Sequence, residues 1–192
     1  MNDFAINPFL EKKIFVAENF YQNPYKVREL ALEQNFQANL NYYKGKRTDE
    51  QVIFEGTKEA FESVMGQKIT KWADYYPMCG RFQSCTAEDS LVYHWDNQKW
   101  AGMIYLTPDA PYVGGTSMFS HKKTRIRHES EPGSSVSFEG GFYDRSKFEL
   151  VDTVGNVFNR LVIFDAKCIH AANEYFGKDL QSSRLFHMFF FD

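Results

Sequence analysis

The feature that most constrains the fold is a series of short apolar and aromatic runs after residue 79, each bounded by turn residues. Short runs rich in Val, Ile, Phe and Tyr between such boundaries are typical of β-strands. The pattern predicts strands at residues 80–86, 91–96, 101–107, 116–121, 148–154, 161–165, 169–175 and 184–191. So many short strands in one stretch indicate a sandwich or a barrel.

The chain before these strands has a helical pattern. Asn23-Pro24 predicts a helix start, with Asn as the N-cap and Pro in the first turn. A second helix is predicted at residues 57–65, ended by Gly66. Helices followed by strands predict a mainly β fold with α, a double-stranded β-helix (jelly roll) with an N-terminal helical layer. We expect one domain over residues 1–192, with a helical brace over about 1–78 and a jelly-roll core over about 79–192.

Composition excludes several classes of protein. The 192 residues fit one domain, and 43% hydrophobic residues with 17% aromatics are far from a disordered composition. The net charge of -3 argues against a nucleic-acid or anionic-membrane partner, and no apolar stretch is long enough to span a bilayer. The first ten residues do not resemble a secretory signal, and the three cysteines lack CxxC spacing. These features favour a reduced, cytoplasmic location.

His94 and Asp96 form the sharpest local chemical feature. Residues two apart on a strand point to the same face, so both side chains would project inward while Trp95 points away. An imidazole and a carboxylate placed in this way can supply two ligands of a two-His-one-carboxylate metal site. The pair alone is equally compatible with a strand-end histidine hydrogen-bonded to a neighbouring acid.

Two residues in the last third of the chain add to this pattern. His170 lies between small and apolar residues, which suits either a core histidine or a third metal ligand. Arg184 begins a nearly all-apolar strand, where a buried guanidinium is costly unless it is paired with an anion. Asp192, at the opposite end of that strand, is too far away to pair with it. A guanidinium that awaits a carboxylate ligand explains its place, and an arginine reaching water at the strand edge is the alternative.

In their order along the chain, these motifs resemble those of the iron(II)/2-oxoglutarate dioxygenases, most closely their prolyl-4-hydroxylase-like branch. The shared pieces are H-x-D, then G-G-x-[ST]-x-F, an apolar strand, a distal His and an Arg on the last strand. In this sequence they are residues 94–96, residues 114–119, residues 161–164, His170 and Arg184. The resemblance extends from about Tyr93 to the C-terminus.

The resemblance implies a ligand set and a reaction. His94, Asp96 and His170 would hold iron(II), and Arg184 would pair with the distal carboxylate of 2-oxoglutarate, the co-substrate. The implied reaction is oxidative decarboxylation of 2-oxoglutarate to succinate and carbon dioxide, coupled to hydroxylation of a C–H bond. The substrate is left open between a small polar metabolite, an amino acid and a peptidyl residue, and the oligomeric state is not indicated.

The resemblance also implies two supporting residues. Tyr105 matches a position that often hydrogen-bonds the distal carboxylate, and Ser117 falls where the branch often has Thr. Phe186 departs from the pattern, because many members carry a hydroxyl residue there. Ser182 or Tyr105 is left to supply the missing hydrogen bond.

Two segments and two rival functions complete the expectations. The basic run at residues 121–128 is either a solvated loop or a holder of an anionic substrate group. Residues 129–142 are expected to form a mobile loop, and the sequence leaves open whether this loop is a lid. One rival function is a cupin-like module that binds a metal or ligand without turnover, which leaves Arg184 unexplained. The other is a zinc-dependent hydrolase or isomerase, for which Glu139 or Asp144 would have to act as acid or base.

Overall fold

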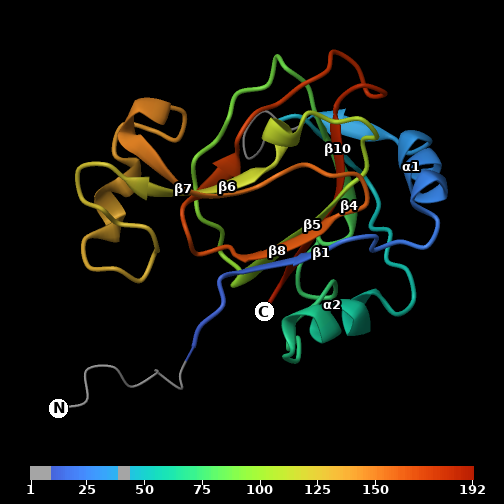
Figure 1. Cartoon of the computed structure of the whole chain (residues 1–192), viewed down its shortest axis with the longest axis horizontal. Helices are drawn as coiled ribbons and strands as arrows, with labels where there is room; N and C mark the ends of the chain where they lie inside the picture. Colours follow the sequence, from blue (N-terminus) through green and yellow to red (C-terminus); the bar gives the residue numbers. More distant parts are fainter. Residues whose placement is uncertain (1–9, 39–43) are drawn as a thin grey trace.

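The computed structural model describes residues 10–38 and 44–192, which form two antiparallel sheets and two helices (Figure 1). The larger sheet has the strand order β1-β8-β5-β10-β4-β3-β2, and the smaller has the order β7-β6-β9. The strands are β1 (Ile14–Ala17), β2 (Phe36–Ala38), β3 (Lys46–Thr48), β4 (Arg81–Cys85), β5 (Trp100–Tyr105), β6 (Thr116–His121), β7 (Phe148–Val154), β8 (Leu161–Asp165), β9 (His170–Ala172) and β10 (Arg184–Phe191). This arrangement confirms the predicted jelly-roll fold class.

The position of β10 in the larger sheet explains why its sequence is almost continuously apolar. It pairs with β4 along one edge and with β5 along the other, so it is a central strand, and its two faces have different surroundings. One face contributes to the core under the helices through Leu185, Phe189 and Phe191. The other face borders a cavity with Arg184, Phe186, Met188 and Phe190. The alternation of the strand therefore places Arg184 inside the cavity.

The two helices cover one face of the larger sheet. Helix α1 (Pro24–Leu32) begins after Asn23, which occupies the N-cap position as predicted but makes no side-chain capping hydrogen bond. Helix α2 (Thr57–Met65) has the predicted bounds and ends at Gly66, whose φ of 69° is left-handed. Phe61 of α2 packs edge-on against Phe189 of β10, with ring centroids 4.9 Å apart. None of the described residues forms a helix long and apolar enough to cross a membrane.

Three predicted features of the fold were wrong. Residues 91–96 form no strand: a single bridge joins His94 to His170, and the neighbouring amides bond to loops. The strand predicted at 169–175 is limited to His170–Ala172. Strands β2 and β3 were not predicted, because each has only three residues, too few to show the alternation that marks a strand. With β1, they add three strands to the segment that we expected to be a helical brace.

His187 lies on the helix-facing side of β10, away from the cavity. Its ring is fully buried, and Nε2 lies 3.0 Å from the Gly80 carbonyl while Nδ1 lies 2.6 Å from the Tyr21 hydroxyl. Because a carbonyl only accepts, Nε2 carries the proton and the ring is neutral. Burial lowers the pKa of His187 to about 4.

This buried histidine predicts acid-sensitive stability. Between about pH 6.5 and pH 4 the unfolded state binds a proton at His187 that the folded state excludes, so stability falls as the pH drops through this window. The contribution of this residue is about 3 kcal/mol. We expect His187→Gln to flatten that part of the curve in urea unfolding series from pH 7 to pH 4.5. The same pH slope in both proteins would show that His187 does not govern it.

Candidate metal centre

Three potential metal ligands meet where the segment before β5 crosses β9. His94 and His170 exchange backbone hydrogen bonds of 3.1 and 2.8 Å, which fixes the two residues side by side. Asp96 lies between their rings: Oδ1 is 3.5 Å from His94 Nε2, and Oδ2 is 3.5 Å from His170 Nε2. One donor atom from each residue lies within 4.8 Å of the other two. The structure thus brings together all three residues that we predicted as ligands.

The hydrogen bonds of both rings prepare their Nε2 atoms for a metal. His94 Nδ1 lies 3.0 Å from the Val92 carbonyl, and His170 Nδ1 lies 2.9 Å from the Cys168 carbonyl. A carbonyl only accepts, so each Nδ1 carries a proton and each Nε2 is the ring atom that faces Asp96. Two ring nitrogens that face one carboxylate need a positive charge between them, either protons or a metal ion. The donor set therefore fits a divalent metal of the kind bound by two imidazoles and one carboxylate.

The charges at the centre also favour metal binding. Burial by itself would raise the pKa of Asp96, but hydrogen bonding to His170 and His94 and their positive charge hold this pKa well below its usual range. Burial by itself would lower the pKa of His94, yet the hydrogen bond and charge of Asp96 raise it, while the positive charge of Arg47 acts in the opposite direction. Asp96 is therefore anionic at physiological pH.

A second cluster of potential ligands, His128, Asp165 and Cys168, has the opposite hydrogen-bond polarity. The backbone amide of Ser130 donates to His128 Nδ1 at 3.1 Å, so the proton sits on Nε2, which faces Asp165 Oδ2 at 3.4 Å. Lys13 Nζ lies 2.7 Å from the same oxygen. Burial raises the pKa of Cys168 to about 11, which keeps the thiol protonated. This cluster already has its cation and offers no free imidazole lone pair, so it fits a metal ion less well than the first cluster does.

One cavity joins the three ligands to Arg184. It has a volume of about 780 Å³, and its walls include His94, Asp96, His170 and Arg184. The Arg184 side chain is only 2% exposed, and its Nε donates to the Gly114 carbonyl at 2.7 Å. Within the described part of the chain, no carboxylate lies within ion-pair distance of Arg184. A buried cation held by neutral carbonyls beside a cavity provides a favourable environment for an anion.

Paired glycines allow this arrangement of carbonyls. A Cβ on Gly115 would lie 1.9 Å from the Val154 carbonyl oxygen, and one on Gly114 would lie 2.5 Å from the Phe176 ring. Only glycine lets the start of β6 approach so closely, and the approach brings the carbonyls of both glycines to Arg184.

We expect Gly115→Ala to cost about 2–3 kcal/mol in the free energy of unfolding, since the added Cβ overlaps a backbone atom that cannot move alone. Displacement of the backbone at Gly115 should also weaken binding of any anion at Arg184. Gly155→Ala is the matched control, because its Cβ would come no closer than 3.4 Å to a neighbour. Urea unfolding of both variants checks the expectation, and equal stabilities would disprove the proposed backbone contact.

Of the two residues predicted to support the site, Tyr105 lies beside Arg184 and Ser117 does not. The Tyr105 hydroxyl is 2.8 Å from Thr116 Oγ1, and the Tyr105 ring lies beside the guanidinium of Arg184. Ser117 points away from the cavity and hydrogen-bonds Thr153, so its predicted role is corrected. Thr116 is the hydroxyl residue that lines the cavity, and its Oγ1 lies 3.1 Å from Arg184 Nη2. The sequence motif could not show this, because adjacent strand residues face opposite sides.

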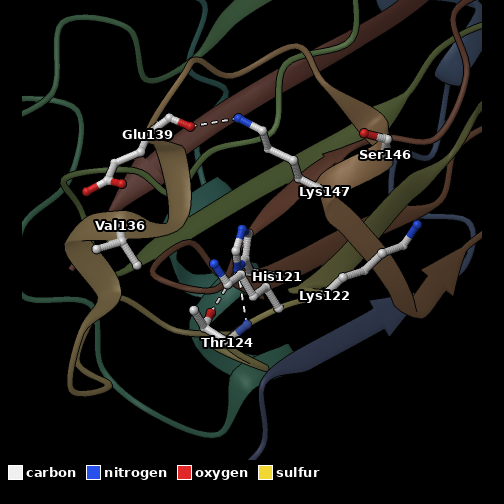
Figure 2. Close-up of a pocket in the computed structure, with 8 residues that line it drawn as sticks. His121, Lys122, Thr124, Val136, Glu139, Ser146 and Lys147 are labelled. Atoms are coloured by element: carbon white, nitrogen blue, oxygen red, sulfur yellow. Dashed lines mark hydrogen bonds between the residues drawn. The ribbon is translucent and has the colours of Figure 1, made fainter.

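The basic run lies at a different cavity. His121, Lys122 and Lys123 line a hollow of about 540 Å³ that shares no residue with the metal cavity. Figure 2 shows Lys147 reaching across it to the backbone carbonyl of Glu139, a hydrogen bond of 2.6 Å. None of residues 121–128 lines the metal cavity. Whether residues 129–142 act as a lid stays open.

Comparisons with known proteins agree on the fold. A sequence model described as a family of unknown function, DUF6445, matches residues 8–191. A search of curated proteins gave no match. Among solved structures, HygX from Streptomyces hygroscopicus, with nickel, 2-oxoglutarate and hygromycin B bound, is 11% identical with a TM-score of 0.61, over 92% of this chain and 81% of that chain.

Two prolyl hydroxylases are also similar. One, from Trichoplax adhaerens in complex with a peptide of hypoxia inducible factor, is 13% identical with a TM-score of 0.50, over 94% of this chain and 84% of its own. The other, a prolyl-4-hydroxylase from Pseudomonas putida, is 14% identical with a TM-score of 0.50, over 93% of this chain and 91% of its own. The chain thus shares the fold of the enzymes that its motifs resemble.

Proposed function

Because the chain belongs to DUF6445, a family whose description gives no activity, we propose its function from its own site: an oxygenase that uses iron(II) and 2-oxoglutarate to hydroxylate a C–H bond. The observation that carries this proposal is the presence, in one cavity, of a two-His-one-carboxylate ligand set and a buried arginine without an acidic partner. A metal-binding module alone has no use for such an arginine.

The spacing between the two features suits 2-oxoglutarate. Met118 of β6 pairs with His170, and Thr116, two residues earlier, contacts Arg184. Two residues of a strand span about 7 Å, a length that matches an extended five-carbon dicarboxylic acid. The 2-oxo acid end would then lie at His94, Asp96 and His170, with the distal carboxylate at Arg184.

Each residue of the chain has a defined task in this proposal. His94, Asp96 and His170 would hold iron(II), which when bound supplies the redox chemistry that couples 2-oxoglutarate decarboxylation to hydroxylation with O₂. Arg184 binds the distal carboxylate and orients the co-substrate. Thr116 adds a hydroxyl at the same end, and Tyr105 holds that hydroxyl in place.

The rival hydrolase function lacks the two carboxylates that were considered as its acid or base, Glu139 and Asp144. Glu139 lines the separate cavity of the basic run, and Asp144 accepts hydrogen bonds from Ser146 at the start of a short 3-10 helix. Neither lines the metal cavity. Among the described residues around that cavity, Asp96 is the one carboxylate, and it is committed to the metal.

Thermal unfolding with nickel(II), a surrogate that does not turn over, tests the proposal. We expect 2-oxoglutarate at about a hundredfold excess over its Kd to raise the Tm by about 5–10 °C, and only when nickel is present. Glutarate, which has the same five carbons and lacks the 2-oxo group, should give a much smaller rise. A rise with 2-oxoglutarate that does not depend on the metal would contradict chelation at the centre.

A further inference from the structure

Two of the three proposed metal ligands are held by one turn, residues 165–168 at the end of β8. The backbone amide of Asp96 donates to the Ala166 carbonyl at 2.8 Å, and His170 Nδ1 donates to the Cys168 carbonyl at 2.9 Å. Asp96 and His170 come from segments that are far apart in the sequence. The shape of this turn therefore decides how the backbone of one ligand lies relative to the ring of the other.

The Asp165 carboxylate holds the turn from within. Its Oδ1 accepts a hydrogen bond of 3.0 Å from the Lys167 amide, and the Asp165 carbonyl accepts one of 3.1 Å from the Cys168 amide. An aspartate side chain that binds the amide two residues further on stabilises a turn. Asp165 is only 3% exposed, so water has little access to this bond.

Lys13, just before β1, balances the charge of Asp165. Its Nζ lies 2.7 Å from Asp165 Oδ2, and a buried carboxylate is costly unless such a cation faces it. His128 Nε2 contacts the same oxygen from 3.4 Å and takes no part in the bonds within the turn. The cluster of His128, Asp165 and Cys168 thus has a use beside the metal centre without holding a metal of its own.

The attachment of β1 to β8 does not depend on this carboxylate. Backbone pairing joins Ile14–Ala17 to β8, and the amide of Asp165 donates to the Lys13 carbonyl at 2.9 Å. These backbone bonds place β1 without the Asp165 side chain. The effect of the side chain therefore falls on the turn and, through the carbonyls of the turn, on the ligands.

Resting on the proposed function, we propose that Asp165 is a positioning residue of the metal centre: its carboxylate holds the 165–168 turn in the shape that places Asp96 and His170 for the metal. Asp165 does not line the metal cavity, so it acts through the Ala166 and Cys168 carbonyls. The ligands are then in position before the metal binds, and the metal does not have to order the turn.

Cobalt(II) binding to the metal-free full chain tests this inference without turnover. The visible absorption of cobalt(II) depends on its ligands and coordination number, so one titration gives both an affinity and a spectrum. We expect Asp165→Ala to lower cobalt affinity by about 10–100-fold, the usual effect of losing a group that supports a ligand. At saturating cobalt its spectrum should differ from that of the parent protein, because the His170 ring is no longer fixed.

Asp165→Asn tests the role of the side chain more gently. Asparagine keeps an oxygen that can accept from the Lys167 amide, but it places a neutral amide group next to Lys13. The turn should be held less firmly than in the parent protein and more firmly than in Asp165→Ala. We therefore expect its cobalt affinity to lie between those of the other two proteins.

Asp89→Ala is the matched control for a general loss of stability. Asp89 also accepts hydrogen bonds from two backbone amides, those of Thr86 at 2.8 Å and Gly45 at 3.0 Å. In the described part of the chain, the turn that it stabilises holds none of the three ligands. We expect Asp89→Ala to bind cobalt with the affinity and spectrum of the parent protein. Circular dichroism at the titration temperature shows whether each variant is folded.

The inference is overturned if folded Asp165→Ala binds cobalt with the affinity and spectrum of the parent protein, or if Asp89→Ala loses as much affinity. If Asp165→Ala does not fold, Asp165→Asn decides: a lowered affinity supports the inference, and the affinity of the parent protein overturns it.

Failure of the proposed function gives a different result. A parent protein that binds no cobalt, or binds it equally well after His170→Ala, has no metal centre at these residues, and the role of Asp165 falls with it. If Asp165→Ala binds cobalt normally and 2-oxoglutarate still stabilises the nickel-loaded protein, the proposed function stands and only the role of Asp165 is wrong.

Discussion

Replacing His170 with alanine is expected to lower metal affinity by more than about 100-fold and to abolish metal-dependent consumption of 2-oxoglutarate. His170 supplies a buried Nε2 whose lone pair is fixed by the bond from Nδ1 to the Cys168 carbonyl. Loss of a residue that merely supports a ligand costs 10–100-fold in affinity or activity, so loss of the ligand itself costs more. Titration of metal-free protein with nickel(II) measures the affinity.

His128→Ala is the control, because His128 belongs to the cluster in which Nδ1 accepts a hydrogen bond. We expect this variant to bind metal as the parent protein does. If His128→Ala loses the metal and His170→Ala keeps it, the two clusters have been assigned the wrong way round.

Arg184→Gln is expected to weaken 2-oxoglutarate binding by about 100-fold, or about 3 kcal/mol. The guanidinium is the cation held at the Thr116 end of the cavity, and glutamine cannot replace its charge. The affinity of Arg184→Lys for 2-oxoglutarate should fall between those of the parent protein and Arg184→Gln, since lysine keeps the charge and loses the planar fork of the guanidinium. Nickel-dependent titration with 2-oxoglutarate measures the effect.

Stability separates this binding role from a structural one. Because Arg184 is buried without a carboxylate partner among the described residues, its charge costs free energy in the absence of a ligand. We expect Arg184→Gln to change the free energy of unfolding of the ligand-free protein by less than about 2 kcal/mol. If Arg184→Gln is strongly destabilised, yet its folded fraction binds 2-oxoglutarate with the affinity of the parent protein, Arg184 only supports the fold.

Much of the fold could be predicted from the sequence, because local sequence signals mark the ends of its strands and helices. Strands β6, β7, β8 and β10 and helix α2 have the predicted bounds, since apolar runs and turn residues such as Gly66 mark their ends. Strands β2 and β3 could not be found in this way, because each has only three residues and depends on pairing with its neighbours in the sheet. Arg47, which lies on β3, was missed as a cavity residue for the same reason.

The candidate site was predicted in part. His94, Asp96, His170 and Arg184 could be proposed because their residue types are costly or unusual in apolar surroundings. The strand expected around His94 does not exist, yet the single bridge to His170 produces the same juxtaposition. The choice between Thr116 and Ser117 depended on which residue faces the cavity, and one position along a strand reverses that. Only the pairing of β6 with β9 and β7 decides it.

The most direct test of the account is an anaerobic titration of the metal-free protein with iron(II) and then 2-oxoglutarate, followed by visible absorption. The expected result is the weak charge-transfer band of a chelated 2-oxo acid, which saturates at one 2-oxoglutarate per iron, is absent in His170→Ala and needs far more 2-oxoglutarate in Arg184→Gln. The absence of any band in the parent protein, together with tight zinc binding, would contradict the oxygenase assignment and favour a metal-binding module or a zinc hydrolase.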